Sequence, residues 1–221
     1  MKQTWKFKVI KTDKQYPFLI IDDYYTPEEE KLVWQELDYY ASWPYDKIDR
    51  SEKNNASGKY SDGESKAKGF RFYLDEFYRR EIAYCSHILN FQYKQREGSI
   101  QNALRHVQPY YSSFVDSNCD VSFISYYEDK DGYDTHWDVA SWSQLTWFVK
   151  EPRRFDGGDF VLEQPNIKVK LKHNRSILFP SVYKHRVIPV KSHSNMEKGY
   201  GRWTLTHFYF WNDEKRFKNN V

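Results

Sequence analysis

Long apolar runs are missing from this 221-residue sequence, although 19% of its residues are aromatic. No stretch approaches the roughly 18 apolar residues that a membrane-spanning helix needs, so we expect no membrane contact. The segment Met1–Phe7 also lacks the apolar centre of a secretory signal. These absences predict a soluble protein located in the cytoplasm.

Cysteine is scarce as well, because Cys85 and Cys119 are the only two in the sequence. Two thiols cannot build the disulfide framework typical of small secreted domains, although one bridge between them stays open. Cys85 falls in a segment with a helical pattern. We therefore expect it to be a small buried apolar residue rather than a reactive thiol.

An excess of one charge is also absent. The 34 Lys and Arg residues nearly balance the 31 Asp and Glu residues, and the net charge is +3. The two signs are interspersed, without the long basic run of a nucleic-acid-binding arm, so we expect no nucleic-acid partner. The sequence does contain 19 Tyr, 15 Phe and 8 Trp residues, which can bury a large apolar area.

The first half of the sequence predicts one strand followed by helices. A short apolar run over residues 17–23 predicts the strand. Thr26 offers an N-cap and is followed by a proline, so we predict a helix over residues 27–40. Apolar residues at helical spacing predict a second helix over residues 75–95 and a weaker third one over residues 100–107.

A long polar segment lies between the first two predicted helices, over residues 46–69. Loops of this length are usually either inert or lids over a binding site, and both readings stay open. We find no internal repeat and no linker. The sequence therefore predicts a single domain over residues 1–221.

The second half of the sequence predicts β-structure, because short strand-like segments alternate with turns rich in Gly, Pro, Asn or charged residues. This spacing is typical of a β-sandwich or jelly roll, so we predict a mainly β fold with flanking helices (α+β). The predicted strands are Val121–Tyr127, Ser143–Lys150, Gly158–Leu162, Ile167–Leu171, Ser176–Phe179, His185–Val190 and Arg202–Phe210.

Two histidines and one aspartate form a candidate metal site. Asp138 follows His136 by two residues, and His185 comes 49 residues after His136. Alternate side chains of a strand share a face, so His136 and Asp138 can point at one ion while Trp137 points away. Two imidazoles and one carboxylate are the ligand set of mononuclear ferrous oxygenases. The alternative is an ordinary pair of histidines near a turn.

Arg202 and Thr204 share a face of the last predicted strand by the same alternation. Arginine can hold a distant carboxylate through two charge-assisted hydrogen bonds, and a threonine hydroxyl can add another. A surface salt bridge is the alternative for Arg202. Arg186 is the fallback anchor, but it alternates away from His185 and should face outward.

Tryptophans and other histidines near these motifs fit more ordinary roles. We expect Trp147 to pack in the core, whereas Trp142 is a candidate for the mouth of a substrate site. The remaining histidines lack a partner at ligand spacing and are expected to be surface or core residues. They are His87, His106, His173, His193 and His207.

In combination, these pieces resemble the catalytic core of prolyl-4-hydroxylase-type Fe(II)/2-oxoglutarate dioxygenases. The likeness covers about residues 120–211 and follows the order of the family. The matching residues are Tyr127, Gly132–Asp138, Gly157–Asp159, His185–Val190 and Arg202–Thr206. The resemblance implies a double-stranded β-helix core (jelly roll, cupin-like) supported by N-terminal helices over residues 1–119.

The resemblance also implies a role for each site residue. His136, Asp138 and His185 match the iron ligands and would be the catalytic residues, and Arg202 matches the residue that pairs with the far carboxylate of 2-oxoglutarate. Tyr127 and Thr204 match hydroxyl residues near that carboxylate, although Tyr126 could replace Tyr127 after a one-residue slip. Fe(II), 2-oxoglutarate and O2 are the implied cofactors, with L-ascorbate associated.

One departure from the family is the 17-residue distance from His185 to Arg202, where a shorter hairpin is common. The intervening residues 191–200 are polar and contain Gly199, which predicts a longer exposed turn. If that turn is not a simple bulge, the assignment of Arg202 is affected.

The reaction implied is hydroxylation of an unactivated C–H bond, because related halogenases lack the carboxylate that Asp138 supplies. Peptidyl proline is the first substrate to consider, and a free amino acid or another small metabolite fits as well; the oligomeric state stays open. The alternative from another class is a non-catalytic cupin-like module that binds a metal or a ligand. Such a module would need no carboxylate anchor at Arg202.

Overall fold

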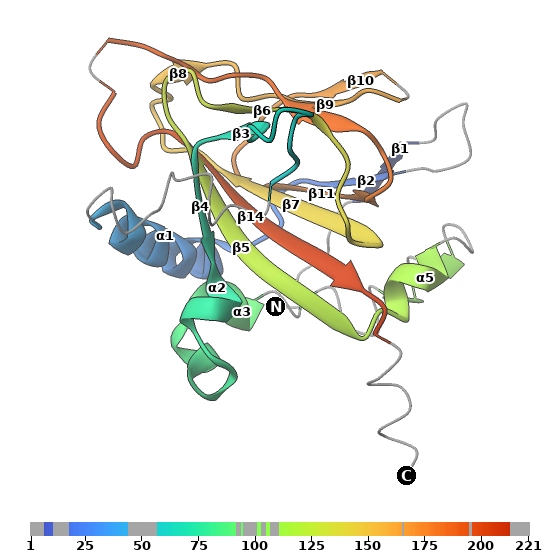
Figure 1. Ribbon diagram of the computed structural model, residues 1–221. Coiled ribbons are helices and arrows are strands. Elements are labelled where there is room, and N and C mark those ends of the chain that lie inside the picture. Colours follow the sequence, from blue (N-terminus) through green and yellow to red (C-terminus); the bar gives the residue numbers. More distant parts are fainter. Residues whose placement is uncertain are drawn as a thin grey trace.

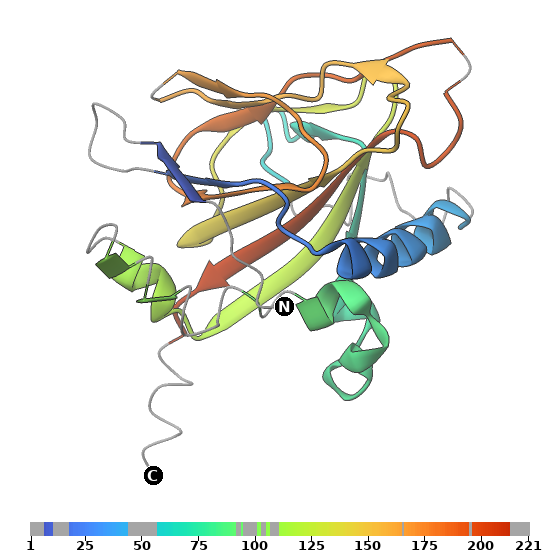
Figure 2. The same cartoon turned by 180° about the vertical axis from the view of Figure 1, so that it is seen from behind.

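The computed structural model describes residues 7–10, 18–43, 57–91, 94, 101–102, 105–106, 111–164, 166–194 and 196–212. Two antiparallel β-sheets lie face to face, and short helices lie along the outer side of the larger sheet (Figure 1; Figure 2). A double antiparallel sheet of this kind is the jelly-roll arrangement. The predicted mainly β fold with flanking helices is therefore confirmed.

Within the described residues, the larger sheet has the strand order β1-β2-β11-β7-β14-β5-β4. Its strands are β1 (Phe7–Ile10), β2 (Phe18–Ile21), β4 (Phe70–Tyr73), β5 (Cys119–Tyr127), β7 (Trp142–Phe148), β11 (Arg175–Pro180) and β14 (Arg202–Phe210). The β14 strand pairs with β5 on one side and with β7 on the other. Predicted strands from the two ends of the β-rich half thus become neighbours.

The smaller sheet has the order β10-β9-β12-β6-β3 in the same part of the chain. Its strands are β3 (Ala67–Lys68), β6 (Gly132–His136), β9 (Phe160–Leu162), β10 (Ile167–Val169) and β12 (His185–Val187). A separate ladder joins β8 (Phe155–Asp156) to β13 (Lys191–Ser192). This ladder begins the predicted long turn before Arg202.

Apolar side chains fill the space between the two sheets. Alternate residues of a strand face the same side, so Leu145 and Trp147 of β7 point inward with Phe160 of β9. The ring centroids of Trp147 and Phe160 lie 6.1 Å apart. The predicted core position of Trp147 is confirmed, because the residue is fully buried.

The α1 helix (Pro27–Ala41) begins at the predicted residue and ends one residue later than predicted. Its first turn is closed by a capping box: Glu29 N–H donates to Thr26 Oγ1 at 3.2 Å, and Thr26 N–H donates to Glu29 Oε2 at 2.8 Å. Buried residues of α1, including Leu37, belong to the same apolar cluster as Trp203 of β14, on the outer face of the larger sheet. The helix thus supports β14 from behind.

The second predicted helix is wrong as one continuous element. The chain instead forms α2 (Leu74–Phe77), the 3₁₀ helix η2 (Arg80–Cys85) and α3 (His87–Phe91). Ser86 separates the last two, because its Oγ accepts a hydrogen bond from Leu89 N–H at 3.1 Å. Serine competes for the backbone in this way and favours caps over helix interiors.

Cys85 shows a consequence of this break. It is exposed rather than buried, so the prediction of a small core residue is wrong. The reason is that η2 turns part of the apolar stripe outward, and Ile82 is 43% exposed. Both cysteines are free, so the bridge left open by the sequence is not formed.

The third predicted helix lies largely outside the described residues, although residues 101–102 and 105–106 are helical. The α5 helix (Ser112–Val115) follows it and was not predicted. Its Phe114 packs with Trp142 and Tyr209 at one end of the larger sheet. Trp142 is 1% exposed and donates its indole N–H to Ser113 Oγ at 3.0 Å. Its predicted place at a substrate mouth is therefore wrong.

No helix of the described residues has both the length and the apolar character that a bilayer crossing requires.

The buried imidazole of His207 on β14 should make the free energy of unfolding depend on pH. Its Nδ1 lies 3.0 Å from Ser122 Oγ, and burial lowers the pKa of His207 from 6.5 to about 4. As the pH falls from 6.5 toward 4, the unfolded chain binds a proton that the folded chain excludes. We expect the free energy of unfolding of the metal-free protein to decrease across this window.

Urea denaturation at neutral pH and at about pH 5 measures this effect, and the H207Q variant is the control. We expect a smaller decrease in H207Q than in the wild type, since glutamine does not titrate. Equal decreases in the two proteins would contradict the assignment of this pH dependence to His207.

Candidate metal and cosubstrate site

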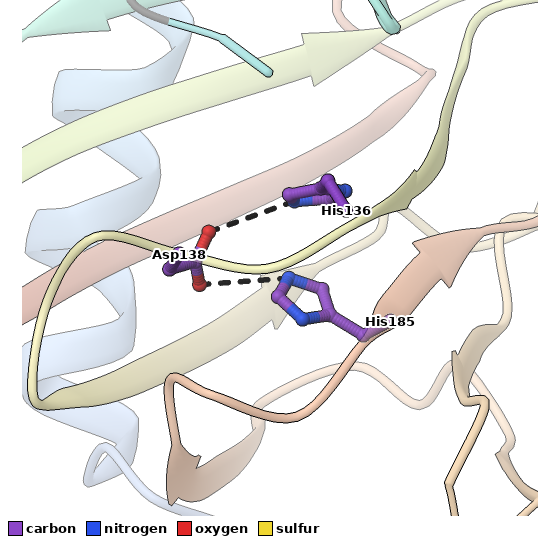
Figure 3. A group of neighbouring side chains, drawn as sticks. All are labelled: His136, Asp138 and His185. Carbon is purple, nitrogen blue, oxygen red and sulfur yellow. Dashed lines mark ion pairs between the residues drawn. The ribbon is translucent and has the colours of Figure 1, made fainter.

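Three predicted ligands meet at one end of the space between the sheets (Figure 3). His136 is the last residue of β6, and His185 is the first residue of β12. The two histidines face each other as partners in the β6–β12 ladder. With Asp138 they offer one ligand atom each, and these atoms all lie within 4.8 Å of one another.

The prediction that Asp138 lies on the same strand as His136 is wrong. It does not share a strand with His136, because β6 ends at His136 and Asp138 lies in the loop before β7. The loop is held in place by the Asp138 N–H, which donates to Ser181 O at 3.1 Å. Trp137 is 59% exposed and points away from the cluster, as predicted.

Two serine hydroxyls orient the Asp138 carboxylate. Ser143 Oγ donates to Asp138 Oδ2 at 2.6 Å and lies 2.8 Å from Ser181 Oγ. Neither serine was predicted as part of the site. Ser181 lies 43 residues beyond Asp138 in the sequence, and only the fold brings its loop beside the carboxylate.

Hydrogen bonds to the backbone determine which histidine nitrogens face the cluster. Nδ1 of His136 lies 2.8 Å from Asp134 O, and Nδ1 of His185 lies 2.8 Å from Tyr183 O. A ring nitrogen that bonds to a carbonyl oxygen must carry the proton, which leaves the lone pair on Nε2. Each Nε2 lies 3.5 Å from one oxygen of Asp138. Two lone pairs and a carboxylate therefore converge, a donor set that fits a divalent cation.

The protonation states of the cluster also suit a metal. Burial lowers the pKa of His185 to about 4, although attraction to Asp138 opposes the shift. Burial would raise the pKa of Asp138, but His185, His136 and the Ser143 hydroxyl together hold it below its ordinary value. At neutral pH His185 is thus a neutral imidazole and Asp138 is a carboxylate, and these are the forms that bind metal ions.

Tyr133 supports His136 from the other side. Its ring stacks on the imidazole with 3.4 Å between the ring centroids and 12° between the planes. The Tyr133 hydroxyl accepts a hydrogen bond from Gly58 N–H at 2.8 Å, and β3 pairs with β6 at Ala67 and Tyr133. The later part of the long polar segment therefore packs behind the cluster. Residues 46–56, on which the lid reading also depends, lie outside the described residues.

Arg202 is fully buried at the start of β14. Its Nε–H donates to Gly158 O at 2.8 Å, and a second guanidinium nitrogen donates to Thr204 Oγ1. Gly158 has a φ of +72°, and a Cβ there would lie 2.9 Å from Arg202 Cδ, so glycine permits this close approach. The predicted turn at Gly157–Gly158 is confirmed by this backbone.

The remaining nitrogen of Arg202 explains why a ligand fits here. This buried atom has no hydrogen-bond partner among the described residues. Burial lowers the pKa of Arg202 to about 10, although Tyr127 and Asp159 oppose the shift, so the group stays charged at neutral pH. A buried charged donor without an acceptor is costly. An anionic ligand in the pocket would supply the missing acceptor.

Tyr127 and Tyr126 point to opposite sides of the larger sheet. Tyr127 lies across from Arg202 in the β5–β14 ladder, and its ring centroid lies 5.1 Å from Arg202 Cζ. Tyr126 instead packs with the helices, and its hydroxyl accepts hydrogen bonds from Gly199 N–H and Gly201 N–H. The one-residue shift that would have put Tyr126 in place of Tyr127 therefore does not occur.

The long turn over residues 191–200 does not remove Arg202 from the pocket. The β13 strand pairs with β8, and Met196 packs against the inner core rather than standing free. Arg186, the fallback anchor, forms an ion pair with Glu163 at 2.7 Å and lies outside the pocket. The outward orientation predicted for Arg186 is confirmed.

A single pocket joins the cluster to Arg202, with about 380 Å³ of empty space including its mouth. The residues predicted from the sequence that line it are His136, Asp138, His185, Arg202, Tyr127 and Thr204. Sequence reasoning missed Arg71, which also lines this pocket. The alternating segment Phe70–Tyr73 was the available signal, since it resembles a strand with Arg71 on one face.

Residues 121–210 match the family model described as the 2OG-Fe(II) oxygenase superfamily. The resemblance inferred from the sequence is therefore confirmed over this part of the chain. The match includes all six predicted site residues, and the name of the superfamily states both the metal and the cosubstrate. The donor set of the cluster fits Fe(II), and the unpaired nitrogen of Arg202 fits a carboxylate of 2-oxoglutarate.

A relative with a similar sequence is a PKHD-type hydroxylase of Crocosphaera subtropica, which is 32% identical over 80 residues. The alignment covers 31% of this chain and 36% of the relative, so it spans about a third of that protein.

Solved structures resemble this chain over most of its length. A prolyl-4-hydroxylase from Pseudomonas putida has a TM-score of 0.56 and 12% identity, with 88% of this chain and 92% of that chain covered. A viral collagen prolyl hydroxylase from Paramecium Bursaria Chlorella virus-1 has a TM-score of 0.54 and 15% identity, with coverage of 96% and 98%. At these identities the likeness establishes the shared double-stranded β-helix fold.

Proposed function

We propose that this protein is an Fe(II)- and 2-oxoglutarate-dependent dioxygenase that hydroxylates an unactivated C–H bond. The observation that carries the proposal is the one pocket that holds both the cluster of metal-binding groups and the unpaired nitrogen of Arg202. The superfamily match supports it. We further propose that residues 1–221 act as a single domain with the catalytic core at about residues 120–211.

In this proposal His136, Asp138 and His185 bind the iron, which supplies the O2 chemistry that no side chain can perform. Ser143 orients Asp138, and Tyr133 holds the ring of His136. Arg202 binds the C5 carboxylate of 2-oxoglutarate, with the hydroxyls of Thr204 and Tyr127 nearby. The buried strands around these residues keep water from the reacting groups.

The overall reaction converts 2-oxoglutarate, O2 and R–H into succinate, CO2 and R–OH. One oxygen atom enters succinate and the other enters the product. The cosubstrate and the substrate each lose two electrons, and these four electrons reduce O2. A peptidyl proline and a small amino-acid-like metabolite are both compatible with this balance. The use of L-ascorbate and the cytoplasmic location stay predictions.

A non-catalytic cupin-like module is the second candidate. A barrel that only binds a metal has no need of a buried guanidinium beside the metal, and burying that charge would cost stability without a return in function. We therefore favour the dioxygenase.

Anaerobic titration distinguishes the two candidates. We expect Fe(II) and 2-oxoglutarate together, and neither alone, to produce the weak visible charge-transfer band of the chelated metal. On admission of O2, succinate should form. Replacing 2-oxoglutarate by succinate is the matched control and should give no band. A protein that binds Fe(II) but shows neither the band nor succinate would be the cupin-like module.

A further inference from the structure

A second cleft lies beside the Gly157–Gly158 turn. It has a volume of about 370 Å³ and shares no lining residue with the pocket of the candidate metal cluster. The turn connects the two, because Gly158 O accepts a hydrogen bond from Arg202 Nε–H in the pocket, and Gly157 O accepts one from a side-chain N–H of Arg153 in the cleft. The turn therefore holds two guanidiniums, and the proposed function uses only that of Arg202.

The carboxylates of this cleft already have partners. Asp159 Oδ1 accepts a hydrogen bond from Leu171 N–H at 2.8 Å, and Asp159 Oδ2 lies 2.9 Å from Lys168 Nζ. Asp156 Oδ2 lies 3.2 Å from His193 Nε2. The acidic residues are thus matched by donors next to them.

The two cations that line the cleft, Arg153 and Lys170, are not matched in this way. Neither forms an ion pair with a carboxylate in the part of the chain that the structure describes. Arg153 Cζ lies 4.4 Å from the ring centroid of Phe155, a contact that fixes a guanidinium but leaves its charge in place. Arg153 Nε is buried without a hydrogen-bond partner among the described residues. A buried donor without an acceptor is costly, so an acceptor in the cleft would stabilise this arrangement.

A small oxyanion has the chemistry that these two side chains recognise. A guanidinium presents N–H donors in a planar fork, and Gly157 O uses only one of those of Arg153. Lys170 is exposed and adds a compact charge on a flexible stem. The oxygens of a carboxylate, sulfate or phosphate group can accept from both cations at once.

The cleft and the pocket are close enough for their charges to interact. Since Arg153 and Arg202 bond to the carbonyl oxygens of successive residues, their guanidiniums lie roughly 10 Å apart, about one Debye length at 0.1 M ionic strength. Repulsion by Arg153 adds to burial in lowering the pKa of Arg202 to about 10. An anion on Arg153 would therefore weaken the positive potential that attracts a carboxylate to Arg202.

We propose that Arg153 and Lys170 bind a small oxyanion, and that this anion weakens the binding of 2-oxoglutarate at Arg202. The binding of the anion goes beyond the proposed dioxygenase function and does not depend on it. Only the effect on 2-oxoglutarate rests on that function. By linkage, 2-oxoglutarate should weaken the binding of the anion by the same factor.

Sulfate is the probe for the binding site, because it is a dianion and a weak ligand of Fe(II). Thermal unfolding of the metal-free full chain is followed over a range of sulfate concentrations, with chloride at equal ionic strength as the reference. We expect sulfate to raise Tm beyond chloride, with an apparent affinity that falls on the order of 10-fold or more in the R153Q/K170Q variant. The general stabilising effect of sulfate acts on all variants alike, so the difference between variants reports the site.

Two further variants make this comparison specific. K170Q alone changes an exposed side chain, so it should fold whatever Arg153 contributes to the turn, and it should lose part of the sulfate affinity. The matched control is R79Q/K31Q, which removes the same two charges from exposed residues outside the cleft and should respond to sulfate as the wild type does.

The effect on the cosubstrate is measured as the KM for 2-oxoglutarate in sulfate and in chloride at equal ionic strength. We expect sulfate to raise this KM on the order of two- to fivefold in the wild type and to leave it unchanged in R153Q/K170Q. An increase that persists in R153Q/K170Q would mean that sulfate competes directly at Arg202, and it would overturn the coupling. So would a wild-type KM that sulfate does not change.

Other outcomes would overturn the binding site itself. They are a wild-type response to sulfate no larger than to chloride, equal sulfate responses of the wild type and R153Q/K170Q, and a response that is lost in R202Q but kept in R153Q/K170Q. A protein that binds sulfate in the cleft but forms no succinate from 2-oxoglutarate would instead overturn the proposed function, and the binding site would stand.

Discussion

Replacing Asp138 by alanine is expected to lower 2-oxoglutarate turnover by more than about 100-fold, because even groups that only support metal ligands are worth 10- to 100-fold. Asp138 supplies the only carboxylate of the cluster found among the described residues. Without it, two neutral imidazoles would have to hold the ion alone. Succinate formation at saturating Fe(II) and 2-oxoglutarate measures the effect, and equilibrium dialysis of Fe(II) measures the loss of metal.

Asp156→Ala is the matched control for this experiment. Asp156 is exposed, pairs with His193 at 3.2 Å and lies outside the pocket of the cluster. We expect this variant to keep wild-type turnover and metal content. Undiminished succinate formation by D138A, in a folded protein that retains Fe(II), would refute the assignment of Asp138 as a ligand.

Replacing Arg202 by glutamine is expected to raise the KM for 2-oxoglutarate strongly. Removing one partner of a buried charged pair typically costs about 2–5 kcal/mol, which corresponds to about 30-fold or more. R202K keeps the charge but loses the planar pair of donors, so its KM should lie between those of R202Q and the wild type. Initial rates of succinate formation over a range of 2-oxoglutarate concentrations give these values.

R186Q is the control for Arg202, since Arg186 was the alternative anchor and its side chain is paired with Glu163 outside the pocket. We expect its KM for 2-oxoglutarate to equal that of the wild type. The anchor assignment fails if R186Q raises this KM and R202Q does not. Thermal unfolding of both variants ensures that a misfolded protein is not mistaken for a loss of binding.

Local signals in the sequence predicted most of the elements that carry the site. The capping residues before α1 and the alternation in β5, β7 and β14 depend on neighbours along the chain, so they could be interpreted without a fold. The broken second helix was missed for the opposite reason. Its apolar spacing looked continuous, but Ser86 used its hydroxyl to start a new helix.

Pairing between distant segments of the chain determined the features of the site that could not be predicted from the sequence. Ser181 reaches Asp138 only because the loops before β7 and β12 lie together. Arg71 enters the pocket through the cross-strand pairing of β4 with β5. Neither arrangement leaves a periodic pattern in the sequence, since each depends on how distant segments of the chain come together in the fold.

The sequence by itself determined the kind of chemistry, because the types and order of His136, Asp138, His185 and Arg202 restrict which ligands can bind. The tertiary structure decided where those ligands can lie, since it set the ring nitrogens that face the cluster and left one nitrogen of Arg202 unpaired. Residue types are local properties of the chain. Distances, burial and unpaired atoms arise only when two sheets close over a common space.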